Sequence, residues 1–359
     1  MNILETLLEI IPIPTTTHKT EAMSKWIIDY LNRQYNQGAN LHMKHDKYGN
    51  IYVTKGQSAL YPTMVCHIDT VHNLNNNVKA FIHDDVLYAM DTSDMTQFGT
   101  GGDDKVGIAI TLKMLDHFDN FKAVFFLDEE YGCLGSSQCD SSFFDNSTVV
   151  LQCDRRGKSD FVNNISGTKL YGKSLRKKIL PHLKKYNRKE TNGGITDVGA
   201  IAKKNTVMVA NMSCGYYNPH SSKETINITD VLDTAKLCID IFTTTYNKRY
   251  AFNNVSDRIK TFNYNYGYTN YGTYGSYYHN HTQKKSGYDL AENFYDEEIY
   301  TDNRAQIDTC CEICGSQQVE YDEYSLEVWC HNCGNYIDNY NDIQPITNSN
   351  ENESTHNKN

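Results

Sequence analysis

Histidine and carboxylate side chains that could bind a metal ion lie in five short segments of the first two thirds of the chain. Imidazole nitrogens and carboxylate oxygens both bind zinc, and a carboxylate beside a metal ion can act as a general base. Their order is His-x-Asp, Asp, Glu-Glu, Asp and His, which supplies two imidazoles and three carboxylates for two zinc ions, plus a base. The segments are Cys66-His67-Ile68-Asp69, Gly102-Asp103-Asp104-Lys105, Asp128-Glu129-Glu130, Cys153-Asp154-Arg155-Arg156 and Pro219-His220-Ser221.

Each of the five segments also has a plainer explanation when it is taken alone. A single histidine after a strand is more often structural, adjacent acids before a helix can cap it, and an acid followed by two arginines can pair with them. Asp69 could accept a hydrogen bond from His67 or hold a neighbouring catalytic group. The metal site is therefore predicted by the combination of segments in one order.

Apolar runs typical of buried strands precede three of these segments, at Thr63–Ile68, Ala123–Leu127 and Val149–Cys153. Their alternation with helical patterns predicts an α/β sheet covered on both faces, and such sheets bind ligands at the carboxyl ends of their strands. The other elements expected are helices at Glu21–Gln34, Val106–Phe118, Ile195–Lys203 and Thr229–Tyr246, and a strand at Thr206–Ala210.

The ordered set resembles that of the cocatalytic dizinc metallopeptidases, which include peptidase T, the glutamate carboxypeptidases and the single-domain bacterial aminopeptidases. The resemblance covers about residues 1–247, and it includes a Gly-Gly-x-Asp-like segment at Gly193-Gly194-Ile195-Thr196-Asp197. It implies a zinc-peptidase-like fold, in which a mixed, mostly parallel sheet is sandwiched by helices.

The resemblance also implies which residues bind the two catalytic metal ions. Asp103 would bridge the two ions, His67 and Asp154 would complete the ligands of one, and Glu130 and His220 would complete those of the other. Zinc is the metal expected, and cobalt or manganese are alternatives for the catalytic pair.

Two further residues have implied roles in catalysis: Glu129 as the general base for a water shared by the metals, and Asp69 as the residue that orients His67. The expected activity is hydrolysis of peptide bonds in small peptides, as an aminopeptidase or a di- or tripeptidase. A deacylase of N-acyl amino acids would use the same centre. A catalytically silent binding module is the third reading, although such a module has no chemical need for Glu129 beside Glu130.

The chain departs from the peptidase T group between Arg155 and Pro219, a gap of 65 residues. That gap must already supply helices and strands of the sheet, so the lid and dimerisation domain of that group does not fit. Arg155 and Arg156 are hypothetical replacements for the lid's carboxylate clamp, because guanidinium groups bind carboxylates in a bidentate manner. A surface role is the alternative for both arginines.

A second metal site is predicted near the C-terminus by two Cys-x-x-Cys pairs separated by 15 residues. This spacing is typical of a structural zinc bound by four thiolates, here Cys311, Cys314, Cys330 and Cys333, within a zinc-ribbon-like module at residues 306–340. Neighbouring Cys310 or His331 could replace a ligand. Residues 281–359 hold 16 acidic and 4 basic residues, a net charge of −12, which favours a protein partner for this module over nucleic acid.

The remaining composition sets the expected domain limits and compartment. Residues 1–250 form the expected catalytic domain, 251–305 a Tyr-, Asn- and Gly-rich disordered linker, and 341–359 a disordered tail. The start of the chain lacks the pattern of a signal peptide, and no apolar run is long enough to cross a bilayer. The eleven cysteines, odd in number and partly in Cys-x-x-Cys pairs, favour a reducing compartment, so a cytoplasmic protein is expected.

Overall fold

The structure is a computed structural model that describes residues 2–259, 319–322, 327–330 and 336–337. The chain divides into two compact units, Met1–Lys260 and Thr261–Asn359. The described part of the second unit is an antiparallel sheet of β15 (Val319–Asp322), β16 (Glu327–Cys330) and β17 (Tyr336–Ile337). Three of the four predicted thiolate ligands, Cys311, Cys314 and Cys333, lie outside the described residues, and so do Cys310, His331 and most of the predicted linker.

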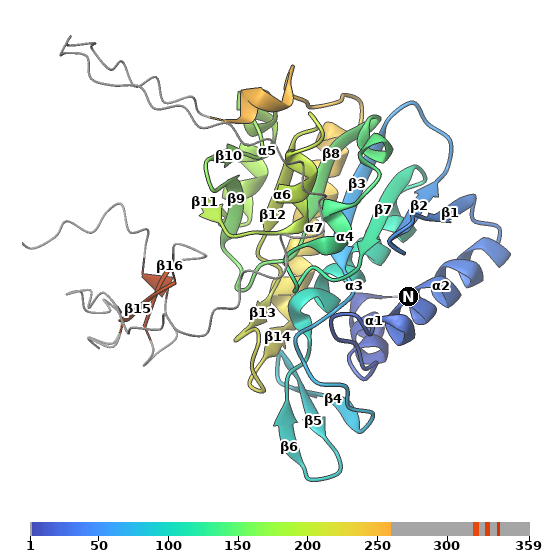
Figure 1. The fold of residues 1–359 in the computed structure, drawn as a ribbon, viewed down its shortest axis with the longest axis vertical. Coiled ribbons are helices and arrows are strands. Elements are labelled where there is room, and N and C mark those ends of the chain that lie inside the picture. The colour runs from blue at the N-terminus through green and yellow to red at the C-terminus, as the bar shows by residue number, and fades with distance from the viewer. Residues whose placement is uncertain (1, 260–318, 323–326, 331–335, 338–359) are drawn as a thin grey trace, which may run out of the picture. The chain divides into compact units, whose positions relative to one another are not determined.

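A nine-stranded mixed sheet forms the centre of the first unit (Figure 1), in the order β1-β2-β7-β3-β8-β12-β9-β10, with β11 also paired to β9. The pairs β7–β3, β3–β8, β8–β12 and β9–β11 are parallel, and the outer pairs are antiparallel. This arrangement confirms the predicted mixed, mostly parallel α/β fold. The strands are β1 (Leu41–His45), β2 (Ile51–Lys55), β3 (Tyr61–His67), β7 (Phe121–Phe126), β8 (Ser147–Gln152), β9 (Asp160–Ile165), β10 (Thr168–Lys169), β11 (Lys189–Gly193) and β12 (Val209–Met212).

The three central strands β3, β7 and β8 are buried along their whole lengths, because helices cover both faces of the sheet. On one side α3 packs against β3 and β7 and contacts α1 and α7, while α6 contacts α4, β3 and β8. The helices are α1 (Ile3–Ile10), α2 (Glu21–Asn36), α3 (Gly102–His117), α4 (Leu134–Ser137), α5 (Lys173–Lys185), α6 (Asp197–Ala202) and α7 (Ile228–Thr245), with short 3-10 helices η1 (Ser141–Phe144) and η2 (Val255–Arg258).

A second sheet of five short strands extends from this unit and flanks the loops that carry two of the predicted ligands. Its order is β13-β14-β5-β4, with β6 paired to β5. It joins the segment between His67 and Asp103 to the segment around His220, because β14 pairs with β5. The strands are β4 (Val78–His83), β5 (Val86–Asp91), β6 (Thr96–Phe98), β13 (Tyr216–Tyr217) and β14 (Thr225–Asn227).

The predicted helices and strands are present, with boundaries that differ from the predicted ones by up to four residues. The expected helix at Ile195–Lys203 begins only at Asp197, and the expected strand at Thr206–Ala210 is β12, Val209–Met212. Within the described part of the chain, no helix is both long enough and apolar enough to span a bilayer.

Candidate metal centre

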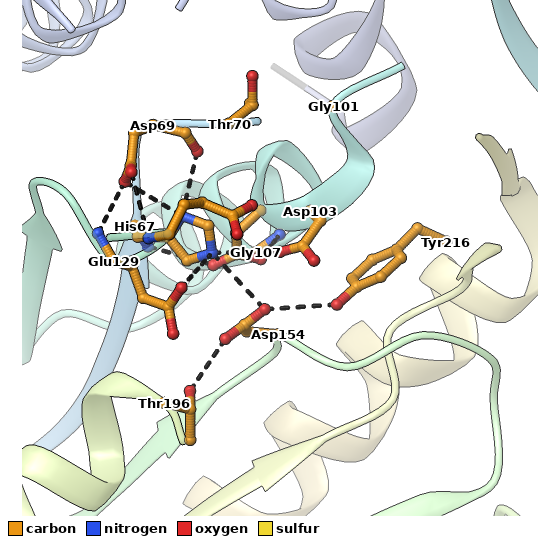
Figure 2. A network of polar contacts seen from close by, with 12 residues as sticks. His67, Asp69, Thr70, Gly101, Asp103, Gly107, Glu129, Asp154, Thr196 and Tyr216 are labelled. Atoms are coloured by element: carbon orange, nitrogen blue, oxygen red, sulfur yellow. Dashed lines mark hydrogen bonds and ion pairs between the residues drawn. The ribbon is translucent and has the colours of Figure 1, made fainter. Parts of the chain in front are cut away.

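The carboxyl ends of three neighbouring parallel strands hold four of the predicted site residues. His67 is the last residue of β3, Glu129 and Glu130 follow β7, and Asp154 follows β8. Since β3 lies between β7 and β8 in the sheet, these side chains converge on one edge (Figure 2). The fold thus explains why residues up to 87 positions apart, from His67 to Asp154, meet at one point.

Asp103 is brought to the same edge by the loop that leads into α3. Gly101 has a left-handed backbone with φ of 62°, and a Cβ atom there would lie 3.0 Å from Cγ2 of Thr70. Asp103 itself is not helical in φ and ψ, and its peptide bond to Asp104 is cis. The regular part of α3 therefore begins after the side chain of Asp103 has been placed beside His67.

The two histidines share Asp103, one on each of its carboxylate oxygens. Nε2 of His67 lies 3.2 Å from Oδ1 of Asp103 and 3.6 Å from Oδ1 of Asp154. Nε2 of His220 lies 3.3 Å from Oδ2 of Asp103 and 3.2 Å from Oε2 of Glu130. The five predicted ligands thus form two groups of three with Asp103 in common.

These separations fit the ligand shells of two metal ions. Ligand atoms at about 2.0–2.1 Å from zinc in tetrahedral geometry are about 3.3–3.4 Å from one another. Oε1 of Glu130 is buried and has no hydrogen-bond partner among the described residues, which leaves a lone pair for an ion. Two clusters compact enough to hold a cation, His67–Asp103–Glu130 and His67–Asp104–Asp154, overlap these two groups without reproducing either of them.

The carboxylates of the centre lie close enough to shift one another's pKa. Burial, followed by the Asp103 carboxylate, raises the pKa of Asp154 to about 7, and the same causes raise the pKa of Glu130. Contacts of His220 with the carboxylates of Asp103 and then Glu130 raise its pKa to about 11. Since a proton and a metal ion compete for the same lone pair, a cation bound by His220, Asp103 and Glu130 would take the place of that proton.

His67 is fully buried and presents only one ring nitrogen to these carboxylates. Its Nδ1 lies 3.1 Å from the carbonyl oxygen and 3.4 Å from Oδ1 of Asp69, which fixes the orientation of the ring and turns Nε2 toward Asp103 and Asp154. Burial alone would lower the pKa of His67, but its contacts with Asp103, Asp154 and Asp69 outweigh burial and raise it.

Glu129 is buried beside the centre without joining either group of three. Its Oε2 lies 3.9 Å from Nε2 of His67, and the Cys133 thiol donates a hydrogen bond of 3.3 Å to Oε1. Burial raises the pKa of Glu129 well above its ordinary value, although the nearby His67 opposes this, and the Asp154 charge adds to it. A carboxylate of raised pKa is a stronger base than an exposed one, which suits proton transfer near neutral pH.

Known structures share this fold. The chain superposes on an aminopeptidase PepT from Bacillus cereus with a TM-score of 0.55 and 15% identity, over 68% of this chain and 98% of that one. It superposes on a tripeptidase from Staphylococcus aureus with a TM-score of 0.55 and 13% identity, over 68% and 98%. For a TET aminopeptidase from a marine sediment thaumarchaeon the TM-score is 0.50 and the identity 11%, over 68% and 97%. The chain has the fold of these peptidases.

The sequence itself gives no such match: no protein-family model and no curated protein matches it. The low identities of the structural matches mean that they show the fold alone. The chemistry of the centre has to be argued from the residues of this chain.

Asp69 has more contacts than the sequence predicted. Besides facing His67, its Oδ1 accepts the backbone N–H of Glu129 at 3.0 Å and its Oδ2 that of Glu130 at 3.2 Å. Thr17 donates its hydroxyl to Oδ2 at 3.1 Å. Asp69 therefore contacts both His67 and the backbone of the Glu129–Glu130 segment.

Asp154 is positioned by three residues that the sequence did not assign to the site. Thr196 donates to its Oδ2 at 2.9 Å and the Tyr216 hydroxyl donates to Oδ1 at 3.4 Å (Figure 2). The side-chain amide of Gln152 also donates to Oδ2, at 3.0 Å. Of these three residues, only Thr196 lies in a segment that the sequence analysis singled out, Gly193-Gly194-Ile195-Thr196-Asp197.

Glu224 is a further unpredicted residue, and it joins the loops of Asp103 and His220. Its buried carboxylate accepts the N–H groups of Gly101 at 2.7 Å and Asp103 at 3.1 Å, and Nε2 of His72 lies 2.8 Å from it. The sequence feature that could have indicated this role is the position of Glu224, four residues after the candidate ligand His220.

The other charged residues of the segments serve the scaffold. Both oxygens of Asp104 accept backbone N–H bonds, from His67 at 3.2 Å and Gly107 at 3.0 Å, so its lone pairs hold β3 and α3 together. Nε of Arg155 donates to Asp160 at 2.6 Å. This ion pair anchors Arg155 to β9, which weakens the hypothesis that it clamps a substrate carboxylate.

Proposed function

We propose that this protein is a two-zinc hydrolase that cleaves the peptide bonds of small peptides, as an aminopeptidase or a di- or tripeptidase. The observation that carries the proposal is the position of Asp103, whose two oxygens each face one histidine 3.2–3.3 Å away. A carboxylate placed in this way can bridge two metal ions.

The ligand sets follow from the contacts. His67 and Asp154 would bind one zinc ion, Glu130 and His220 would bind the other, and Asp103 would bind both. The crowding of these carboxylates is unfavourable without a compensating charge, so the fold itself favours a loaded centre. Cobalt or manganese could fill the same donor set of nitrogen and oxygen atoms.

Bound zinc ions would lower the pKa of a water molecule and polarise the carbonyl of the scissile bond. The side chains of the protein would transfer the proton and position the reacting groups. Glu129, within 3.9 Å of Nε2 of His67, is placed to accept the proton of the attacking water and to return it to the leaving amine. Asp69 fixes Glu129 through its backbone N–H and so sets the position of the base.

Peptides are the proposed substrates because of the structures on which the chain superposes. The superposed structures are two aminopeptidases and a tripeptidase. A deacylase would use the same donor set, so the substrate has to be tested directly.

A separate structural zinc ion is proposed for the C-terminal unit, bound by Cys311, Cys314, Cys330 and Cys333. The support is the spacing of the two Cys-x-x-Cys pairs. A small module of this kind depends on bound metal for its folding. We propose that the acidic residues around it contact a protein partner.

The test is to load the full-length protein with zinc and to expose it to a mixture of free peptides and N-acyl amino acids, with products identified by mass spectrometry. Release of N-terminal residues from peptides supports the proposal, and acyl release would replace it by the deacylase. Absence of any product from a protein with zinc bound would refute both.

Substitution of the base is the sharper test. We expect Glu129→Gln to lower kcat by about 10²–10⁴-fold, because general-base catalysis contributes that much, while the metal content stays unchanged. The matched control is Glu21→Gln, an exposed acid at the start of α2. Near-normal turnover by Glu129→Gln would rule out this mechanism.

A further inference from the structure

Thr15, Thr17 and His18 of the loop Thr15–His18 form hydrogen bonds with the segments that follow β3 and β7. None of their side chains belongs to either ligand group. The Thr15 hydroxyl donates to the carbonyl of Ile68 at 2.8 Å, and the Thr17 hydroxyl donates to Asp69 at 3.1 Å. The next residue, His18, reaches the segment that carries Glu129.

His18 is held by Asp128, the residue directly before Glu129. Its backbone N–H donates to Oδ1 of Asp128 at 2.7 Å, and its Nδ1 lies 2.9 Å from Oδ2. The Tyr48 hydroxyl donates to the same Oδ2 at 2.8 Å, so Asp128 is an acceptor for three donors. His18 adopts a left-handed backbone with φ of 61°, which a residue with a Cβ atom keeps only when its surroundings hold it there.

The imidazole of His18 is nevertheless open to solvent, with 58% of its side chain exposed. Its ring packs edge-on against Tyr131, the residue directly after Glu130, at 5.4 Å between centroids, and Tyr131 is 61% exposed. Among the described residues Nε2 of His18 has no hydrogen-bond partner. The His18 imidazole therefore has a fixed orientation and contacts Asp128 and Tyr131, the two residues that flank Glu129 and Glu130.

The loop does not need this imidazole for its own stability. Glu129 and Glu130 are already fixed through Asp69, and Asp128 already binds Tyr48 and the backbone of His18. A carboxylate that contacts Nδ1 fixes the orientation of the ring and so the direction of Nε2.

The proposed cleavage next to a free amine indicates which part of a peptide would reach His18. The ammonium end of the substrate then lies at the metal centre, so the carboxylate end of a short peptide extends toward the residues around it. The hydroxyl of the exposed Tyr131 can donate to a carboxylate. The His18 ring can do so when both of its nitrogens carry a proton, with Nδ1 donating to Asp128 and Nε2 to the carboxylate.

We propose that His18, oriented by Asp128 and packed on Tyr131, binds the free C-terminal carboxylate of a short peptide substrate. This inference rests on the proposed peptidase function and makes it more specific, because it favours peptides short enough to reach from the metal centre to His18. It assigns the recognition of the carboxylate to a histidine of the N-terminal loop rather than to Arg155.

The test compares leucyl-glycyl-glycine with its C-terminal amide, using the full-length protein loaded with zinc. The variant is His18→Asn, because asparagine tolerates a left-handed backbone. We expect its KM for the free acid to rise about tenfold with kcat nearly unchanged, and its KM for the amide to stay the same. The control Tyr48→Phe removes the hydroxyl that donates to Asp128 and leaves His18 and Tyr131 in the chain, so any effect on KM should be equal for the two peptides.

An equal loss on both peptides in His18→Asn would show that His18 only positions the loop, and unchanged kinetics on both would show that it has no role; either outcome overturns the inference. These outcomes differ from failure of the proposed function, in which the wild-type protein cleaves neither peptide. Direct binding of the free acid to Glu129→Gln, measured by calorimetry, should weaken about tenfold when His18→Asn is added.

Discussion

Asp69 and Glu224 show how single buried carboxylates organise the metal centre through backbone N–H groups. Asp69 binds the N–H groups of Glu129 and Glu130, and Glu224 binds those of Gly101 and Asp103. Each acid therefore fixes a loop that carries candidate ligands. Outer contacts of this kind commonly change metal affinity by about 10–100-fold when they are removed.

Glu224→Gln is expected to weaken metal binding by about tenfold or more. All three partners of this carboxylate are donors, and an amide can accept with only one of its two ends, so one buried donor loses its acceptor. Competition with a chelator would measure the zinc affinity. Ser222→Ala, an exposed substitution in the same loop, is the control, and equal affinities of the two variants would contradict a positioning role for Glu224.

The candidate ligands could be predicted from the sequence because each lies in a short segment next to a recognisable strand or helix start. Glu224 and Tyr216 could not be predicted, since their contacts join residues 121–123 and 62 positions apart. Gln152 lies only two residues before Asp154, but nothing in the sequence indicates that its amide also contacts Asp197. His18 was missed for the same reason, because its partner Asp128 lies 110 positions away.

At the scale of elements, long periodic or fully apolar segments were predictable and short ones were not. α2, α3, α7 and the buried strands β3, β7 and β8 carry clear patterns. The five-stranded sheet consists of strands of two to six residues with exposed positions, so it shows little alternation. Its pairing of β14 with β5 nevertheless places the loop of His220, which makes this small sheet part of the scaffold of the candidate metal centre.

α7 follows the His220 loop and is fastened to the sheet by aromatic packing. Phe242 is fully buried, and its ring lies 5.6 Å from Phe121 and 5.9 Å from Phe118. Phe242→Ala should lower the free energy of unfolding by about 3–5 kcal/mol, because it removes buried apolar surface and leaves a cavity. Urea unfolding followed by circular dichroism would measure the change.

The control for this substitution is Tyr246→Ala, at the exposed end of the same helix. It should change the free energy of unfolding by no more than about 0.5 kcal/mol. If Phe242→Ala were as mild as this control, the packing of α7 would not depend on the aromatic cluster.

At the scale of the whole molecule, charge and metal chemistry are divided between the two units. Residues 281–359 hold 16 acidic and 4 basic residues, whereas the first 280 residues hold 28 acidic and 30 basic ones. Every candidate ligand of the two-metal centre lies in Met1–Lys260, and every Cys-x-x-Cys pair lies in Thr261–Asn359. Each unit therefore has its own proposed metal site.

A chain that ends after residue 260 should consequently keep the proposed peptidase activity. The first unit contains the central sheet, its covering helices, the core and all the side chains placed at the metal centre, so the truncation removes none of the contacts that position Glu129. We expect kcat/KM within about twofold of the full-length value, the same response to Glu129→Gln, and two zinc ions per chain where the full-length protein binds three. Metal analysis and peptide hydrolysis measure both quantities. A tenfold loss of kcat/KM with two zinc ions still bound would mean that the C-terminal unit takes part in catalysis.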